Sequence, residues 1–364
     1  MRRRGDGSSG SGEEDGAVGR LLDEAADAFE EGRFDVALAR ADEALRAGAR
    51  SVPALHYRAA ALAELGRPDE ALEAYERALA AGKGDPELLL GAADFLVNLG
   101  GDDDPDRERV ERGVDLARRG AKLAQKARDR QLAGELAYVE AVGLNQLGRS
   151  GEALQRLELA EAELPESPDV QVEKGFALFE LCRFVESRRA LERADKLGPD
   201  DAWTQHYLGL VAEKQGGADE ARRRFARARK LSPEDFPKGV ALSQAAFDEA
   251  VEAALASLPE AVRRYLSNVA ITVEDLPCDD DLLASDPPLS PAILGLFRGA
   301  PYGQKASMDP WSHFPSAIVL FQKNLERFAR SRADLIEQIG VTLIHEVGHF
   351  LGLDEDELYE RGLD

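Results

Sequence analysis

A repeat with a period of 34 residues runs through the first two thirds of this 364-residue chain. The segments EEGRFDVALARADEAL and AELGRPDEALEAYERAL show the period, because Gly32 recurs as Gly66 and Ala37 recurs as Ala71. Downstream, the position of these glycines is held in turn by Gly148, Cys182 and Gly216. A fixed period of this length is typical of stacked supersecondary units, and it constrains the fold more than any other feature of the sequence.

The small residues of the repeat have a mechanical role. Two antiparallel helices approach closely only where their side chains are small, so the repeated alanines are expected at the helix crossings. Glycine can adopt a positive φ, which ends the first helix and lets the chain turn. Proline stops the second helix, and it follows the last three units at one fixed place, as Pro165, Pro199 and Pro233. The pattern therefore predicts units of two antiparallel helices.

This pattern resembles the tetratricopeptide repeat, and Leu208 and Gly209 match the usual Leu-Gly pair of its first helix. After Gly100 the segment GDDDPDRE interrupts the frame, which we interpret as a loop inserted in the third of about six units. The resemblance implies an α-solenoid over residues 17–235 that binds a peptide or protein on its concave face. Because the chain is acidic, we expect these partners to carry Lys or Arg.

Composition limits the other classes of partner. The 46 basic and 69 acidic residues give a net charge of −23, which would repel a phosphate backbone. The first 16 residues, MRRRGDGSSGSGEEDG, lack an apolar segment and predict a disordered tail instead of a signal peptide. There is no apolar run long enough to span a bilayer, and two cysteines are too few for a disulfide framework. We expect a cytoplasmic protein with no nucleic-acid or membrane partner.

The composition changes after the last repeat, and residues 240–364 are expected to form a second, α+β domain. The segments VAITVEDLP, AILGLFRG and SAIVLF have the β-branched, apolar character of strands. The segment RADLIEQIGVTLIHEVGHFLG predicts a helix with one continuous apolar face. The fold class expected for the chain is thus an α-solenoid followed by a small α+β domain.

The last helix carries two of the five histidines of the chain, in the string HEVGH. Four residues advance a helix by about 400°, so His345 and His349 lie roughly 6 Å apart along its axis and can reach one metal ion. Glu346 is offset by one residue and can reach a water bound to that metal. This is the HExxH motif of zinc peptidases. Gly352 can turn the chain back, which makes Asp354 or Glu355 available as a third ligand.

The extended pattern is similar to the mini-zincin family of zinc metallopeptidases, on the segments ALASLPE, VEDLP, ILGLFRGAP and TLIHEVGHFLGL. The resemblance implies a zincin-like fold in which zinc is bound by His345 and His349 and Glu346 is the general base. The third ligand is predicted to be Glu355, where the related pattern has Asp, with Asp354 as the alternative. No methionine follows the motif, so the Met-turn of the metzincins is excluded.

Two interpretations of the whole chain remain open. In the first, it is a zinc metallopeptidase whose repeat array selects or delivers the substrate. In the second, it is a non-catalytic scaffold whose zinc site is structural or vestigial. The intact Glu346 favours the first, because a structural site needs no base. Tyr359 is a weaker candidate for a donor to the oxyanion, and His313 is a weaker candidate for a donor to the substrate.

Overall fold

The computed structural model describes residues 10–47, 51–82, 84–99, 106–266, 269–299, 316–354 and 357–358. Contacts between Cα atoms divide the chain into two compact units, Met1–Ala177 and Leu178–Asp364. The last helices of the repeat pattern thus belong to the same unit as the C-terminal region, and the domain boundary expected at residues 235–240 stays a prediction. No helix in the described ranges is both long and apolar enough to cross a membrane.

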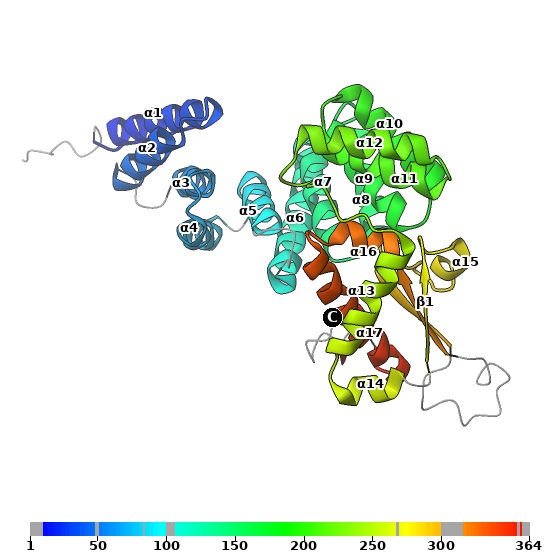
Figure 1. The fold of residues 1–364 in the computed structure, drawn as a ribbon. Helices are drawn as coiled ribbons and strands as arrows, with labels where there is room; N and C mark the ends of the chain where they lie inside the picture. Colours follow the sequence, from blue (N-terminus) through cyan, green and yellow to red (C-terminus); the bar gives the residue numbers. More distant parts are fainter. Residues whose placement is uncertain are drawn as a thin grey trace, which may run out of the picture. The chain divides into compact units, whose positions relative to one another are not determined.

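The first unit consists of helices (Figure 1). Their bounds are α1 Gly10–Glu30, α2 Phe34–Ala47, α3 Val52–Glu64, α4 Pro68–Ala81, α5 Pro86–Asn98, α6 Arg107–Ala127, α7 Arg130–Gln146, α8 Ser150–Glu163 and α9 Pro168–Glu180, the last of which crosses the boundary between the units. Helices pack as successive pairs, α1 with α2, α3 with α4, α5 with α6 and α7 with α8. Helix α1 begins at Gly10, inside the stretch 1–16 that the sequence assigns to a tail.

The turns inside the helix pairs have the conformation that the repeat predicts. Gly66 has a φ of 68° and Gly216 a φ of 79°, the left-handed region in which glycine has no steric penalty. Cys182 occupies the same position of the repeat and has a φ of 57°. A residue with a Cβ is strained in this region by about 1 kcal/mol, so the turn that follows α9 forms without the glycine that suits it best.

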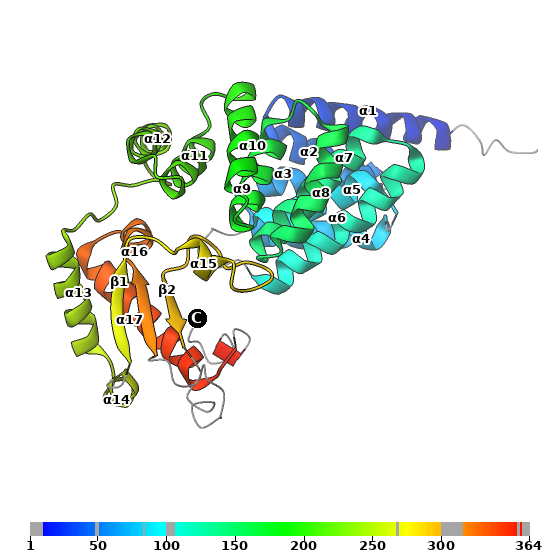
Figure 2. The same cartoon turned by 90° about the vertical axis from the view of Figure 1, so that its right-hand side faces the viewer.

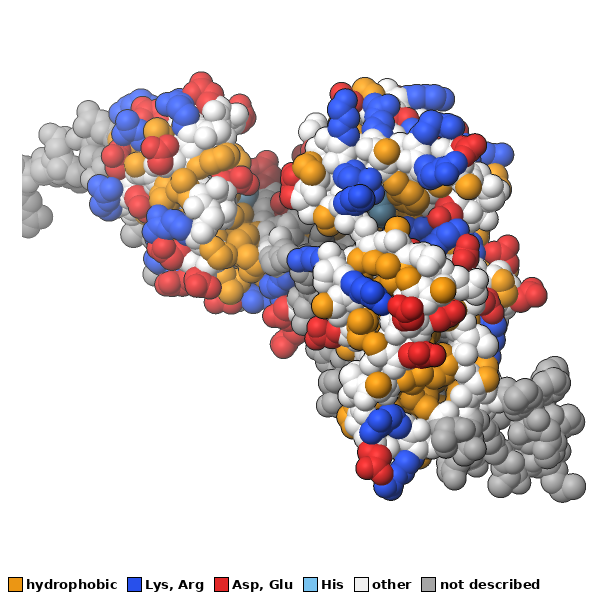
Figure 3. Space-filling model, in the orientation of Figure 1, with side chains coloured by type: hydrophobic (Ala, Val, Ile, Leu, Met, Phe, Trp, Pro, Cys, Tyr) orange, Lys and Arg blue, Asp and Glu red, His pale blue; other side chains and the backbone are white. Residues whose placement is uncertain are grey.

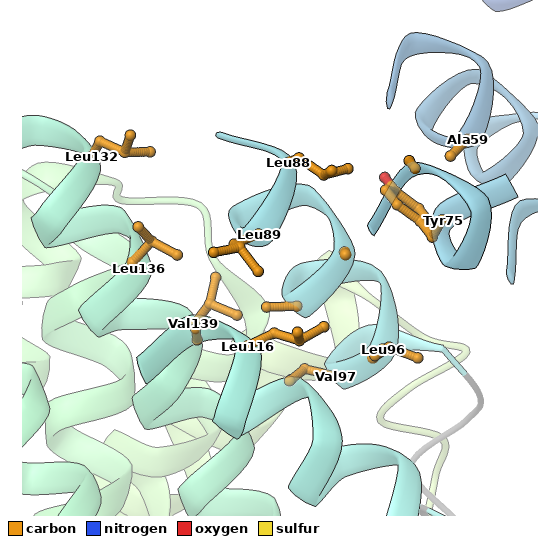
Figure 4. Close-up of a cluster of buried hydrophobic side chains, with 14 of the residues drawn as sticks. Ala59, Tyr75, Leu88, Leu89, Leu96, Val97, Leu116, Leu132, Leu136 and Val139 are labelled. Atoms are coloured by element: carbon orange, nitrogen blue, oxygen red, sulfur yellow. The ribbon is translucent and has the colours of Figure 1, made fainter. Parts of the chain in front are cut away.

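The core of the first unit depends on small residues and leucines (Figure 4). Leu88, Leu89 and Leu136 are fully buried between neighbouring helices. A Cβ on Gly120 would lie 2.6 Å from Leu136 Cδ2, so the absence of a side chain at Gly120 is what lets α6 and α7 approach. The repeated alanines at the crossings are also fully buried, among them Ala37, Ala44, Ala71 and Ala78. The packing that the repeat predicts is therefore present.

The second unit combines helices with one small sheet (Figure 2). Its further elements are α10 Phe184–Leu197, α11 Ala202–Lys214, α12 Ala218–Leu231, α13 Gln244–Ser257, α14 Glu260–Leu266, β1 Ala270–Glu274, α15 Asp279–Leu282, β2 Gly295–Arg298, β3 Ala317–Phe321, α16 Gln322–Phe328 and α17 Arg332–Leu351. The order of the sheet is β1-β3-β2, with β3 parallel to β1 and antiparallel to β2. All three predicted strands are present, and α17 packs against β2, β3 and α13. The chain is thus a helical solenoid followed by a small α+β region, as predicted.

The last repeat helices are held to the C-terminal region by charged groups. Glu213 on α11 forms ion pairs with Arg327 and Lys323, which both lie on α16. The next residue of α11, Lys214, donates a hydrogen bond of 2.6 Å to the carbonyl oxygen of Pro277. These contacts lie within one compact unit, so α11 is part of the surroundings of the sheet.

The glycines of the first unit give a direct test of the turn conformation. At Gly66 and at Gly19 no neighbouring atom lies within 4 Å of the point that a Cβ would occupy, but only Gly66 has a positive φ, of 68°. We expect Gly66→Ala to destabilise the protein by about 1 kcal/mol, because alanine is strained in the left-handed region. Gly19→Ala, inside α1, should stabilise it by about 0.5–1 kcal/mol. The shift of the urea midpoint measures both, and equal shifts of the same sign would contradict the assignment.

Candidate metal centre

Helix α17 is capped at both ends by local hydrogen bonds. At the start, the Ser331 side chain accepts a hydrogen bond of 3.1 Å from the backbone N–H of Asp334. At the end, Gly352 has a φ of 93°, and the N–H of Leu353 donates to the carbonyl oxygen of Gly348 over 3.1 Å. These caps fix the length of the helix, so that the HEVGH string forms its last turns and the chain reverses directly after it.

The two histidines converge as the helical spacing predicts. The Nε2 atoms of His345 and His349 lie 3.1 Å apart, and their ring planes are inclined at 84°. Two nitrogens bound to one tetrahedral zinc, each at about 2.0–2.1 Å, would be separated by about 3.4 Å. The pair therefore fits a shared metal ion.

A hydrogen bond to the backbone orients His349. Its Nδ1 atom lies 3.1 Å from the carbonyl oxygen of Leu353, in the turn that follows the helix. A carbonyl can only accept, so the proton of the neutral ring is on Nδ1 and the lone pair is on Nε2. Metal-binding histidines are commonly oriented in this way by a partner on their other nitrogen. The turn at Gly352 therefore also orients the His349 ring so that its Nε2 atom is available to a metal.

Glu346 faces the sheet and is 5% exposed. It lies against β2 at a glycine: a Cβ on Gly295 would be 3.3 Å from Glu346 Oε1 and only 2.5 Å from Thr342 Cγ2. Thr342 itself donates a hydrogen bond of 2.8 Å to the carbonyl oxygen of Gln338. The missing side chain of Gly295 thus allows α17 to bring the carboxylate of Glu346 against the strand.

Strand β2 lies at the edge of the sheet formed by the described residues. Its inner side pairs with β3, and among the described residues no strand pairs with its outer side. The backbone N–H and C=O groups of such a side can pair with an extended segment. Arg298 fixes the end of the strand, because it forms hydrogen bonds of 2.6 Å to Glu274 and 2.9 Å to Asp281. An edge strand and a buried carboxylate thus lie beside the histidine pair.

The segment after the helix folds back onto it. Gly348, inside the motif, leaves space for the buried side chain of Leu358. The Asp354 carboxylate accepts a hydrogen bond of 2.9 Å from the N–H of Glu357, and the Glu357 carboxylate accepts one of 3.1 Å from the N–H of Asp354. This reciprocal arrangement is a capping box. The carboxylate of Asp354 is therefore engaged in a local structural role.

The remaining predicted site residues are not placed. Glu355, Tyr359 and His313 lie outside the described residues. Among the residues that the structure describes, there is no group of three or more His, Cys, Asp or Glu side chains arranged to hold a metal ion. The described part of the centre is therefore a pair of histidines with Glu346 beside it, and the third ligand stays a prediction.

The sequence did not single out Gly295 or Thr342, although both determine where Glu346 lies. A signal was present, because a glycine within an apolar strand such as AILGLFRG often marks the close approach of another element. The identity of that element could not be read from the sequence. Pairing of β2 with β3 and packing of α17 on both strands decide it.

Comparisons with known proteins agree with a helical repeat array and a zincin-like C-terminal region. Residues 266–363 match the family profile described as zincin-like metallopeptidase, and residues 52–95 match a tetratricopeptide repeat profile. No curated protein matches the chain significantly.

Solved structures resemble the helical part. The chain is similar to PilF of Pseudomonas aeruginosa, with a TM-score of 0.51 and 17% identity over 61% of this chain and 94% of that one. It is also similar to PilW, described as a type IV pilus biogenesis factor, with a TM-score of 0.51 and 16% identity over 60% of this chain and 94% of that one. At this identity the likeness concerns the fold alone, which is that of a tetratricopeptide solenoid.

The contact between Gly295 and Thr342 can be tested by a pair of substitutions. We expect Gly295→Ala to destabilise the protein by about 1–3 kcal/mol, because its methyl group would lie 2.5 Å from Thr342 Cγ2. Thr342→Ser removes that Cγ2 atom and keeps the hydroxyl that donates to Gln338. The double variant should therefore be more stable than Gly295→Ala alone, as measured by urea denaturation. Additive losses in the double variant would show that Thr342 does not limit the approach of α17.

Proposed function

We propose that residues 240–364 form a zinc-dependent metallopeptidase domain and that the repeat array binds its substrate or a partner. The observation that carries this proposal is the convergence of the His345 and His349 Nε2 atoms to 3.1 Å, one residue away from a buried glutamate. The match of residues 266–363 to a zincin-like profile supports it independently.

His345 and His349 would hold the metal, with Glu355 as the third ligand. Asp354 is the weaker alternative, because its carboxylate already accepts the N–H of Glu357 over 2.9 Å and would have to leave this cap. Zinc in such a site lowers the pKa of its bound water to about 7 and polarises a peptide carbonyl. The contact of His349 Nδ1 with the Leu353 carbonyl would leave its Nε2 lone pair for the metal, at 3.1 Å from His345 Nε2.

Glu346 would act as the general base. From its position against β2 it would take the proton of the attacking water and deliver it to the leaving amine. Its burial excludes bulk water from the carboxylate, which strengthens its interaction with the reacting groups. Tyr359 and His313 are proposed as weaker contributors, Tyr359 at the oxyanion and His313 on the substrate side.

An extended peptide would align along the outer side of β2. Backbone hydrogen bonds to an edge strand hold a substrate independently of its sequence, so selection would fall to other surfaces. The repeat array would supply such a surface, since tetratricopeptide arrays are protein-interaction modules. A cytoplasmic location is proposed with it, and it agrees with the two free cysteines, Cys182 and Cys278.

The second candidate function is a scaffold with a structural zinc site. Structural sites are closed by four protein ligands, whereas a catalytic site keeps one position for water. The described residues contribute two histidines and, beside them, the buried Glu346, and a structural site does not require a base. These observations favour the peptidase, and the following measurements separate the two functions.

Zinc should bind at one ion per chain. Purified protein that is loaded with zinc and desalted should retain about one equivalent, measured by elemental analysis, and His345→Ala or His349→Ala should lose most of it. Retention far below one equivalent in the wild type would refute the metal site. The third ligand can be identified in the same assay. Glu355→Ala should lose more zinc than Asp354→Ala. The reverse order would identify Asp354 as the ligand.

Glu346→Gln should keep the zinc and lose the hydrolysis. The amide has nearly the same shape but cannot accept the proton of the water, so turnover of an unstructured protein such as casein should fall by about 10²–10⁴-fold. Glu337→Gln, an exposed position on the same helix, is the matched control and should leave turnover unchanged. Zinc bound at one equivalent in a wild type that cleaves nothing would instead favour the scaffold.

A further inference from the structure

The second unit contains a cavity of about 610 Å³ that lies away from the metal centre. Its walls come from α11, α12, α16 and the segment that connects α12 to α13. Aromatic rings form much of the lining: the Phe236 ring packs against Trp203 with centroids 4.8 Å apart and against His206 with centroids 4.6 Å apart. Leu210 and Phe225 add further apolar surface. A cavity of this size and character is typical of a ligand site.

The acidic groups that line the cavity already have partners. Glu213 pairs with Arg327 and Lys323. Glu326 accepts a hydrogen bond of 2.9 Å from the N–H of Leu242, and Asp235 accepts one of 2.6 Å from the Ser232 hydroxyl. Of these carboxylates, only Glu213 is paired with cations, whereas Glu326 and Asp235 accept from neutral donors.

Two basic groups at the cavity are in a different situation. Arg229, on α12, and Lys238, on the connecting segment, both line the cavity. Among the described residues, neither has an ion-pair or side-chain hydrogen-bond partner within reach. Five basic and three acidic side chains line the cavity, so the net charge of its lining is positive. An aromatic cavity with free cations at its wall fits a ligand that combines a large apolar group with an anionic one.

The positive charge continues beyond the cavity along α12. The sequence of this helix, ADEARRRFARARKL, has six basic residues and two acidic ones. Three of the six basic residues, Arg222, Arg224 and Arg227, form ion pairs. Figure 3 shows blue side chains gathered over the helices α10 to α12 of the second unit. Arg223 and Lys230 on this helix are exposed. A ligand that used this surface would extend over more than the cavity itself, which favours a chain molecule over a compact one.

We propose that this cavity binds a peptide segment in which a large apolar side chain is flanked by acidic residues. The apolar side chain enters the cavity and packs against Trp203, Leu210 and Phe236, and the carboxylates pair with Arg229 and Lys238. The site uses no residue of the HEVGH string, so it does not depend on the proposed peptidase activity. The acidic residues of this peptide differ from the Lys- or Arg-bearing partners that the net charge of −23 led us to expect. The local field at a cavity is set by its own unpaired groups and not by the net charge of the chain.

The fluorescence of Trp203 provides the measurement. A Trp311→Phe variant of the full chain, kept metal-free with a chelator, leaves Trp203 as the reporter inside the cavity. Three peptides are titrated at low salt: an acetylated and amidated peptide with Phe flanked by Glu, the same peptide with Lys in place of Glu, and a peptide without Glu that ends in Phe with a free carboxylate. We expect the Glu peptide to bind and the Lys peptide to bind at least tenfold more weakly. The third peptide shows whether the carboxylate can come from a chain terminus.

Substitutions of the two cations make the test specific. Arg229→Gln and Lys238→Gln should each weaken binding of the Glu peptide by about three- to fivefold, and the loss should shrink as salt is added. Lys126→Gln, at an exposed position of α6 and outside the cavity, is the matched control and should have no such effect. Circular dichroism confirms that each variant is folded. Equal losses in all three variants would show a diffuse charge effect, and equal or tighter binding of the Lys peptide would overturn the proposal.

Discussion

The packing of α17 is the constraint on which the C-terminal region depends. One face of this helix is built from Leu335, Ile339, Leu343, Val347 and Phe350, and none of these is more than 4% exposed. They pack into a single core with residues of α13 and the sheet. The same helix carries the HEVGH string, so the position of both histidines follows from burial of the apolar face. Fixed placement of this kind is what a metal site needs, since its ligands must converge without a large loss of entropy.

Residues without large side chains set the closest approaches in both units. Alanines at the crossings let the repeat helices pair, and Gly120 lets α6 meet α7. Near the candidate metal centre, Gly295 allows β2 to lie against Glu346, and Gly348 leaves space for Leu358 beside the motif. In each case a small side chain, or none, permits the short distance between the two elements. A larger side chain would push them apart, because close-packed interiors tolerate little overlap.

Buried charge links the last repeat helices to the sheet region. Burial lowers the pKa of the Arg327 guanidinium. The ion pair with Glu213 stabilises this charge, because a buried cation is stable only with a partner. Burial, with the nearby charge of Arg327 as a smaller cause, also lowers the pKa of His206 to about 4. His206 is therefore neutral near pH 7 and behaves as an aromatic wall of the cavity. The end of the array is thereby built into the same compact unit as the candidate metal centre.

The sequence by itself determined the periodic and local features of this protein. The 34-residue repeat predicted the helix pairs and their glycine turns, and short β-branched, apolar runs predicted the three strands, because both depend on contacts close in sequence. The spacing of His345 and His349 likewise predicted their convergence, since four residues on one helix fix it. Tertiary structure alone decided the rest: that β2 is an edge strand of the sheet formed by the described residues, that Gly295 meets Glu346, and that α11 and α16 line a cavity together with Arg229 and Lys238. Those contacts join segments far apart in the chain, and no local pattern encodes which distant partner a glycine or an arginine will meet.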